Sequence, residues 1–135
     1  MIAVKMRLRK SDIMGKGFAA RVKKMILNSE IVLEVLDSRF PEATRDSVLE
    51  QFTKEKKKIL LFVLNKCDLV PEKFAKKKIA SLKKQAPAVL FSAKKHIGSK
   101  ALRSEIGKAS KKLKLKKGSE RARVCVIGYP NTGKS

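Results

Sequence analysis

The clearest pattern in the sequence is a continuous apolar run, Ile59 to Leu64, that ends abruptly in the polar residues Asn65-Lys66-Cys67-Asp68. Further apolar runs occur at 31–36, 89–91 and 124–127, and amphipathic segments separate them. Short continuous apolar runs between helical segments are typical of buried strands in a parallel sheet. We therefore predict an α/β fold of about four parallel strands with helices on both faces of the sheet.

Four of the intervening segments place apolar residues at helical spacing. The expected helices cover residues 15–28, residues 43–57, a stretch after Pro71, and a stretch from Ser99 to about Lys117. Their apolar stripes comprise Phe18, Val22, Met25 and Ile26; Val48, Leu49 and Phe52; Ala75, Ile79, Leu82 and Ala86; and Leu102, Ile106, Ala109 and Leu113. The first ten residues alternate apolar and basic side chains, which fits either a short extension or an edge strand.

The polar cluster after the central run has the chemistry to recognise guanine. An ionised Asp offers two acceptor oxygens, and guanine presents two adjacent donors, its N1–H and its exocyclic amine, so Asp68 would select guanine over adenine. Asn65 can pair with the other edge of the purine or hold neighbouring loops, and the aliphatic stem of Lys66 can lie against the ring. The alternative is a strand that ends in an ordinary polar turn, and these residues alone do not separate the two interpretations.

Two further motifs strengthen the first interpretation. Gly128-Tyr-Pro-Asn-Thr-Gly-Lys-Ser135 matches the phosphate-binding loop G-x-x-x-x-G-K-[ST], and it follows a predicted strand, as that motif requires. The stretch from Ala88 to Lys94 is another short apolar run that ends in polar residues. Three such motifs in one short chain argue strongly against coincidence.

Asn65 to Asp68 resembles the N-K-x-D motif of GTPases, and Ser92-Ala93-Lys94 resembles their second guanine-contacting motif, in which a backbone N–H reaches the base oxygen. The phosphate loop comes last here, whereas it comes first in ordinary GTPases. This order is similar to that of the circularly permuted GTPases. Asp37-Ser-Arg-Phe-Pro41 further resembles the D-A-R-x-P segment of their ribosome-assembly branch, the YlqF or RbgA-like group, with Ser38 in place of the usual Ala.

The resemblance implies binding of GTP or GDP with Mg²⁺, possible binding of potassium, and a set of site residues. The residues implied to contact guanine are Asn65, Lys66, Asp68, Ser92, Ala93 and Lys94. Those implied to bind the phosphates are Gly128, Asn131, Thr132, Gly133, Lys134 and Ser135, with Ser135 as the Mg²⁺ ligand and Asn131 as the candidate potassium ligand. The implied spatial order of strands is 124–127, 31–36, 59–64 and 89–91, which puts every motif at one edge of the sheet.

The same resemblance sets an expected domain division. Residues 1–135 would form a partial domain, with an extension at 1–14, the guanine-specificity half at 15–117, and a linker, strand and phosphate loop at 118–135. In the family a helix, both switch segments and two more strands follow this point. We therefore expect a fragment of a longer GTPase that does not hydrolyse GTP by itself, with strand 124–127 as an exposed edge and no assigned catalytic residue.

The composition of the chain predicts a polyanionic partner. Lys and Arg number 34 against 12 acidic residues, which gives a formal net charge of +22. This excess favours contact with ribosomal RNA or a precursor of the large ribosomal subunit, led by phosphate contacts and strongly dependent on salt. The alternative function is a non-enzymatic basic RNA-binding module in which nucleotide binding is vestigial.

The remaining features predict a cytoplasmic protein with no membrane association and no obligate oligomer. Cys67 and Cys125 are expected to be reduced thiols in or beside strands. His96 has no partner at catalytic or metal-ligand spacing, so we expect a structural or solvent-facing role. No stretch is long enough to span a bilayer, and the apolar helix faces are all needed to cover the sheet.

Overall fold

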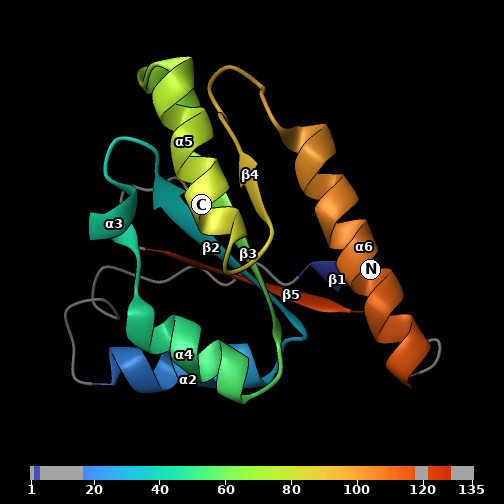
Figure 1. Cartoon of the computed structure of the whole chain (residues 1–135). Helices are drawn as coiled ribbons and strands as arrows, with labels where there is room; N and C mark the ends of the chain where they lie inside the picture. The colour runs from blue at the N-terminus through green and yellow to red at the C-terminus, as the bar shows by residue number, and fades with distance from the viewer. Residues whose placement is uncertain (1, 4–16, 118–121, 129–135) are drawn as a thin grey trace.

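A computed structural model describes residues 2–3, 17–117 and 122–128 of the chain (Figure 1). Five parallel strands form one sheet in the spatial order β1-β5-β2-β3-β4. The strands are β1 (Ile2–Ala3), β2 (Ile31–Asp37), β3 (Ile59–Asn65), β4 (Ala88–Leu90) and β5 (Arg123–Gly128). The helices are α2 (Phe18–Leu27), α3 (Pro41–Thr44), α4 (Ser47–Glu55), α5 (Glu72–Lys83) and α6 (Ser99–Lys117), with a 3₁₀ turn at Cys67–Leu69.

The predicted order of the four main strands is confirmed, and so is their parallel direction. The structure also shows which strand forms this edge of the sheet. Ile2 and Ala3 pair with Arg123 and Val124, so the first residues do contribute an edge strand. Because β1 occupies this position, the start of β5 is not the exposed edge that the sequence predicts.

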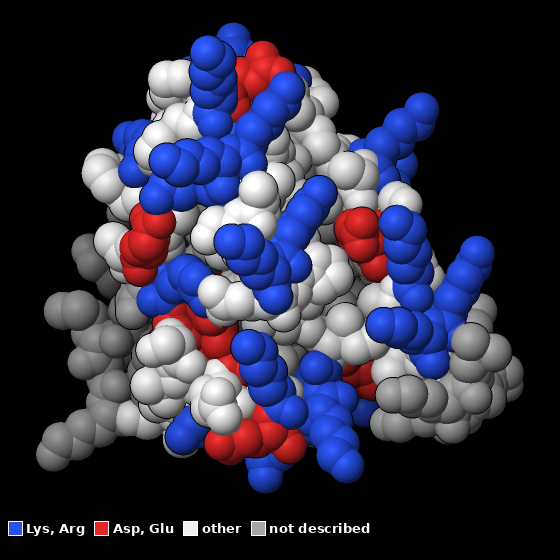
Figure 2. Space-filling model, viewed as in Figure 1, with Lys and Arg blue, Asp and Glu red and all other residues white. Residues whose placement is uncertain are grey.

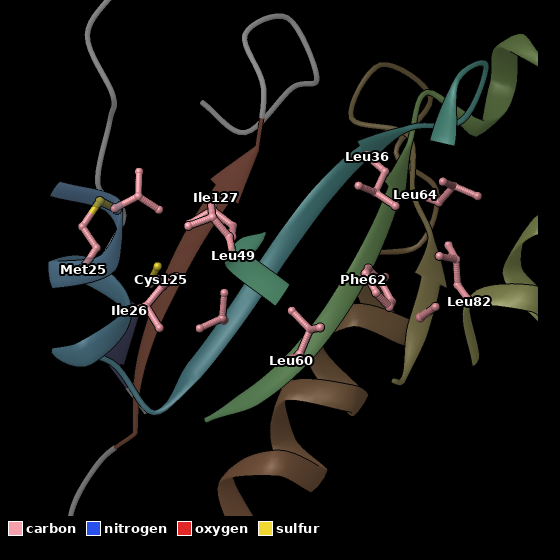
Figure 3. Close-up of a cluster of buried hydrophobic side chains, with 13 residues drawn as sticks. Met25, Ile26, Leu36, Leu49, Leu60, Phe62, Leu64, Leu82, Cys125 and Ile127 are labelled. Atoms are coloured by element: carbon pink, nitrogen blue, oxygen red, sulfur yellow. The ribbon is translucent and has the colours of Figure 1, made fainter. Parts of the chain in front are cut away.

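The two faces of the sheet are covered by different helices, as the alternation of side chains along parallel strands requires. Helices α2, α4 and α5 cover one face, where the buried side chains include Phe62, Leu64 and Ile127. Figure 3 shows α2 lying over β5 through Met25 and Ile26. On the other face, α6 packs through the predicted stripe of Leu102, Ile106, Ala109 and Leu113 against β2, β3 and β5. Each fully buried large apolar side chain contributes roughly 1.5–3 kcal/mol to this assembly.

The predicted helix at 43–57 is wrong in one respect, because the structure divides it into α3 and α4. Arg45 between them is extended, and Asp46 caps α4 by accepting a hydrogen bond from the Leu49 backbone N–H at 3.0 Å. An N-cap fixes the rotation at which a helix begins. Leu49 therefore faces the core, while Val48, which the sequence placed in the apolar stripe, is 65% exposed.

A buried cluster of charged and polar groups lies between β2 and α4. Glu34 is only 1% exposed in the middle of β2, and its Oε2 accepts the backbone N–H of Asp46 at 2.9 Å. Glu50 of α4 is held by two hydrogen bonds from the Arg45 guanidinium, at 2.6 and 3.1 Å. Burial, followed by the hydrogen bond and negative charge of Glu50, raises the pKa of Glu34 to about 9. This carboxyl is therefore protonated at neutral pH.

Candidate nucleotide site at the carboxyl edge of the sheet

The two guanine motifs and Gly128, the first residue of the predicted phosphate loop, lie at the carboxyl edge of the sheet, where open α/β folds bind their ligands. In the strand register Asp37 lies opposite Asn65, Leu64 lies opposite Leu90, and Val35 lies opposite Gly128. The ends of β5, β3 and β4 consequently stand at the same edge. The predicted placement of the motifs at one edge of the sheet therefore holds for the residues that the structure describes.

The first guanine motif forms a sharp turn at the end of β3. Asn65 is the last strand residue and is 4% exposed, and its backbone carbonyl accepts hydrogen bonds from both the N–H and the Oγ of Ser38, at 2.8 and 2.5 Å. Lys66 adopts a left-handed conformation with φ 62°, which turns the chain into the 3₁₀ segment that carries Asp68. The Cys67 N–H then donates to the Phe91 carbonyl at 3.1 Å. The turn is thereby anchored to both neighbouring strand ends.

A direct hydrogen bond joins the two predicted guanine motifs. Ser92 is 1% exposed, and its Oγ donates to Oδ1 of Asp68 at 2.7 Å. The same Oγ accepts the Lys95 backbone N–H at 3.1 Å. A carboxylate has about four lone-pair sites, so Asp68 keeps room for two further donors. Ala93 and Lys94 follow as exposed residues of the turn.

The loop that carries Ser92 closes through a small antiparallel bridge. Ser92 and Ile97 exchange two backbone hydrogen bonds, at 2.9 and 3.0 Å. Gly98 follows with φ 91°, and a Cβ at this position would lie 2.1 Å from the Leu90 carbonyl oxygen. Sequence reasoning did not single out Gly98, although a glycine directly before the expected cap of a helix was a visible indication. His96 is exposed in this loop, as expected of a solvent-facing residue.

The segment Asp37-Ser-Arg-Phe-Pro41 lies against the first guanine motif. The sequence had given this segment no role beyond its resemblance to the D-A-R-x-P segment of the YlqF or RbgA-like group. Asp37 is 5% exposed, and Arg39 donates to its two carboxylate oxygens from Nε at 3.1 Å and from a terminal guanidinium nitrogen at 2.8 Å. The hydrogen bonds from the Arg39 side chain hold the pKa of Asp37 below its ordinary value. Its Oδ2 also lies 3.6 Å from Nζ of Lys66. This ion pair gives Asp37 a role in placing Lys66, which sequence reasoning missed.

The predicted phosphate loop is described only at its first residue. Gly128 ends β5 beside β2. The other predicted phosphate ligands, Asn131, Thr132, Gly133, Lys134 and Ser135, lie outside the described residues, and so does the predicted Mg²⁺ ligation by Ser135. Within the described ranges, no group of three His, Cys, Asp or Glu side chains could hold a metal ion. The Mg²⁺ and potassium assignments therefore stay predictions.

Two further sequence predictions concern thiols and membranes. Cys67 is partly exposed and Cys125 is buried, and both are free thiols, as expected. Burial raises the pKa of Cys125 to about 11, so this thiol stays protonated and unreactive at neutral pH. Among the helices in the described ranges, none has the length and apolar character needed to cross a membrane.

The fold and the order of the motifs define the class of this chain as an α/β domain of the circularly permuted GTPase type. A scan against protein-family models found no match. Comparison with curated proteins gives 41% identity over 114 residues to the uncharacterized GTP-binding protein MJ1464 of Methanocaldococcus jannaschii, covering 84% of this chain and 29% of that protein. The nucleolar GTP-binding protein 2 of Saccharomyces cerevisiae is 37% identical over 93% of this chain and 27% of its own length.

A solved structure agrees with these relatives. A solved structure of GDP-bound TM YlqF matches with a TM-score of 0.53 and 30% identity, covering 84% of this chain and 44% of that one. The chain is therefore homologous to the GTP-binding proteins of the YlqF and nucleolar type, over the part of their length that it spans. That part is less than a third of the curated relatives. The names of several relatives place them in the nucleolus, and the predicted cytoplasmic location of this chain stays a prediction.

Proposed function

We propose that this chain binds guanine nucleotides through the carboxyl edge of its sheet and acts in assembly of the large ribosomal subunit. The observation that supports base recognition most directly is the Ser92–Asp68 hydrogen bond at 2.7 Å, which orients one carboxylate oxygen at the junction of the two motifs. A carboxylate fixed in this way presents its acceptors to the N1–H and exocyclic amine of guanine. Adenine offers no such pair of donors, and unpaired polar groups make a site reject the wrong base.

The neighbouring residues complete the proposed base site. The stem of Lys66, placed by its ion pair with Asp37, would cover one face of the purine ring. Asn65 would hold the turn, and the backbone around Ala93 and Lys94 would donate to the guanine oxygen. Toward the phosphates, we propose Gly128, Asn131, Thr132, Gly133, Lys134 and Ser135, because backbone N–H groups of such loops bind phosphate oxygens. Ser135 would then ligate Mg²⁺, and Asn131 would bind potassium.

The proposed partner is ribosomal RNA. Figure 2 shows Lys and Arg side chains spread across one face of the molecule, with fewer acidic side chains between them. Together with the net charge of +22, this surface is suited to a polyanion. The second candidate function, an RNA-binding module with vestigial nucleotide binding, rests on the same charge. The two differ in one observable: only the first predicts selective binding of GDP.

The test of base recognition is calorimetric titration with GDP, ADP and xanthosine diphosphate. The parent chain should bind GDP and not ADP. Asp68→Asn replaces one acceptor oxygen by an N–H donor, which matches the carbonyl at position 2 of xanthine, so GDP affinity should fall by roughly tenfold or more while xanthosine diphosphate affinity rises. Glu55→Gln, an exposed substitution that removes the same charge, is the control and should leave GDP affinity unchanged.

Unchanged GDP affinity in Asp68→Asn would contradict the base-recognition proposal. Tight RNA binding by a parent chain that binds no nucleotide would instead favour the second candidate function.

A further inference from the structure

A basic pocket lies at the amino edge of the sheet, at the opposite end of the strands from the candidate nucleotide site. Its volume is about 690 Å³. Glu30, which directly precedes β2, and Ile59, which begins β3, form part of its lining. The other described lining residues are Lys56, Lys57 and Lys58 after α4 and Lys112 and Leu113 of α6. Because α4 and α6 cover opposite faces of the sheet, two layers of the fold bring their lysines to one cavity.

The charge of this pocket is strongly positive. Among the described lining residues four are lysines, and the single acid, Glu30, already receives a hydrogen bond from Nε of Arg123 at 3.2 Å. Lys58 is also fixed in place, since its Nζ donates to the Leu27 carbonyl at the end of α2, at 3.2 Å. Concave surfaces of one charge sign concentrate the electric field and attract counter-ions of the other sign.

Lys57 provides independent support, because its backbone conformation is unfavourable for lysine. It has φ 58°, and the two hydrogen bonds after α4, from Lys57 N–H to the Lys54 carbonyl and from Lys58 N–H to the Thr53 carbonyl, form a Schellman motif. This motif strongly prefers glycine at the left-handed position. Residues other than glycine held in that region concentrate at functional sites.

The distribution of non-glycine residues with positive φ within the described residues also supports a functional role for Lys57. Three non-glycine residues there have positive φ: Lys57, Lys66 and His96. Lys66 belongs to the first guanine motif, and His96 lies in the loop that follows Ser92 of the second. Lys57 stands apart from the candidate nucleotide site and lines the basic pocket. Interaction with the helix dipole explains why a lysine lies near the end of α4. It does not explain why Lys57 occupies the left-handed position that prefers glycine, nor why Lys112 of α6 lines the same pocket.

We propose that this pocket binds adjacent phosphates of an RNA duplex, so that RNA and nucleotide occupy opposite edges of the same sheet. The proposal rests on the proposed function, and it adds the location of the RNA contact. A polymer is favoured over a small anion because further exposed lysines of α6, Lys108 and Lys111, lie close to Lys112 along the helix. Recognition would be of backbone and shape, since the described lining residues include no aromatic side chain on which bases could stack.

The test compares two triple variants of equal charge. Lys56→Gln, Lys57→Gln and Lys112→Gln remove the exposed lysines of the pocket, while Lys73→Gln, Lys77→Gln and Lys83→Gln remove exposed lysines of α5. Binding of a duplex of about 20 base pairs is measured by fluorescence anisotropy across roughly 50–200 mM salt. The pocket variant should lose at least tenfold in affinity, and its salt slope should fall by about three, because each phosphate-contacting lysine contributes about one. The α5 variant should change affinity by less than about threefold.

The outcomes separate this proposal from the proposed function. Equal losses in the two variants would overturn the pocket as the contact site, whereas no RNA binding by the parent chain would overturn the RNA role itself. GDP titration of both variants reports on the nucleotide site, and the pocket variant should keep the parent's GDP affinity. Inorganic pyrophosphate is the small-anion competitor, and displacement of RNA by micromolar pyrophosphate would contradict a polymer site.

Single variants of Lys57 exclude unfolding as the cause of weakened binding. Lys57→Gly removes the backbone strain of a left-handed lysine and should raise Tm by a few degrees, but it should weaken RNA binding because the ammonium group is lost. Lys57→Gln keeps the backbone conformation and should weaken RNA binding without raising Tm. A Lys57→Gly variant that binds RNA as tightly as the parent would show that Lys57 does not contact the phosphates.

Discussion

Glu34 is a carboxyl group in the middle of a strand whose other residues are nearly all apolar. Its protonated state in the folded chain follows from burial and from the nearby negative charge of Glu50. Glu50 behaves differently: burial raises its pKa, but the hydrogen bonds from Arg45 and then Glu34 outweigh this and hold the pKa below its ordinary value. One carboxyl of the pair is neutral and the other is ionised, so the cluster needs a single guanidinium to balance its charge.

This arrangement predicts how stability depends on pH. The unfolded chain releases the Glu34 proton above about pH 4.5, whereas the folded chain keeps it until about pH 9. The folded state therefore binds one more proton in this window, and stability should fall as pH rises, by up to about 1.4 kcal/mol per pH unit. Glu34→Gln cannot ionise, and its amide can accept from Asp46 and donate to Glu50.

Urea unfolding at pH 6, 7 and 8 measures the effect. The stability of Glu34→Gln relative to the parent should increase by roughly 2.5–3 kcal/mol across this range. The exposed substitution Glu55→Gln is the control and should show no such trend. Parallel pH profiles for the parent and Glu34→Gln would mean that Glu34 is ionised in the folded chain.

At the scale of an element, the loop from Ser92 to Gly98 is held by its two ends. The Ser92–Ile97 bridge closes it, and Gly98 allows the chain to pass close to the Leu90 carbonyl. In Gly98→Ala, the new Cβ would meet that oxygen and the backbone would remain at φ 91°, so we expect a loss of about 2–3 kcal/mol in unfolding free energy. Because Ser92 holds Asp68, GDP affinity should fall as well.

Gly107 in α6 is the matched control for this substitution. A Cβ there would meet nothing within 4 Å, so Gly107→Ala should stabilise the chain by about 0.5–1 kcal/mol and leave GDP affinity unchanged. Thermal unfolding and GDP titration of the two variants measure both effects. Equal stability of Gly98→Ala and the parent would show that the loop can shift without strain.

The same elements show what the sequence could and could not predict. The strands, their order and the position of the first guanine motif follow from apolar runs and from motif resemblance, because both are local in sequence. The break at Asp46, the exposure of Val48 and the burial of Glu34 depend on how α4 rotates against the sheet. The Asp37–Lys66 and Ser92–Asp68 contacts depend on strand register. Neither rotation nor register can be read from a local pattern.

At the scale of the molecule, the two proposed sites are separated by the length of β3. Seven residues from Ile59 to Asn65 span about 20 Å at the rise of a strand. RNA in the basic pocket and a nucleotide at the carboxyl edge should therefore bind together. We expect GDP to bind the chain at saturating duplex RNA, with any change in its affinity matched by an equal change in RNA affinity.

Calorimetric titration of GDP into the RNA complex measures this, and anisotropy of labelled RNA with and without GDP gives the reciprocal value. Complete loss of GDP binding at saturating RNA would show that the two ligands share one site.

The position of β5 has a consequence for how the chain acquires its fold. This strand lies between β1 and β2 in the sheet, yet it follows the other described strands in sequence, and the hydrogen bond from Arg123 to Glu30 spans 93 residues. Until β5 arrives, the edge of β2 that it covers has no partner within the described sheet. Pairings over such distances form slowly. A nascent chain would thus carry an open edge on β2 until residues 123–128 have been synthesised, and during that interval it is exposed to aggregation and dependent on chaperones.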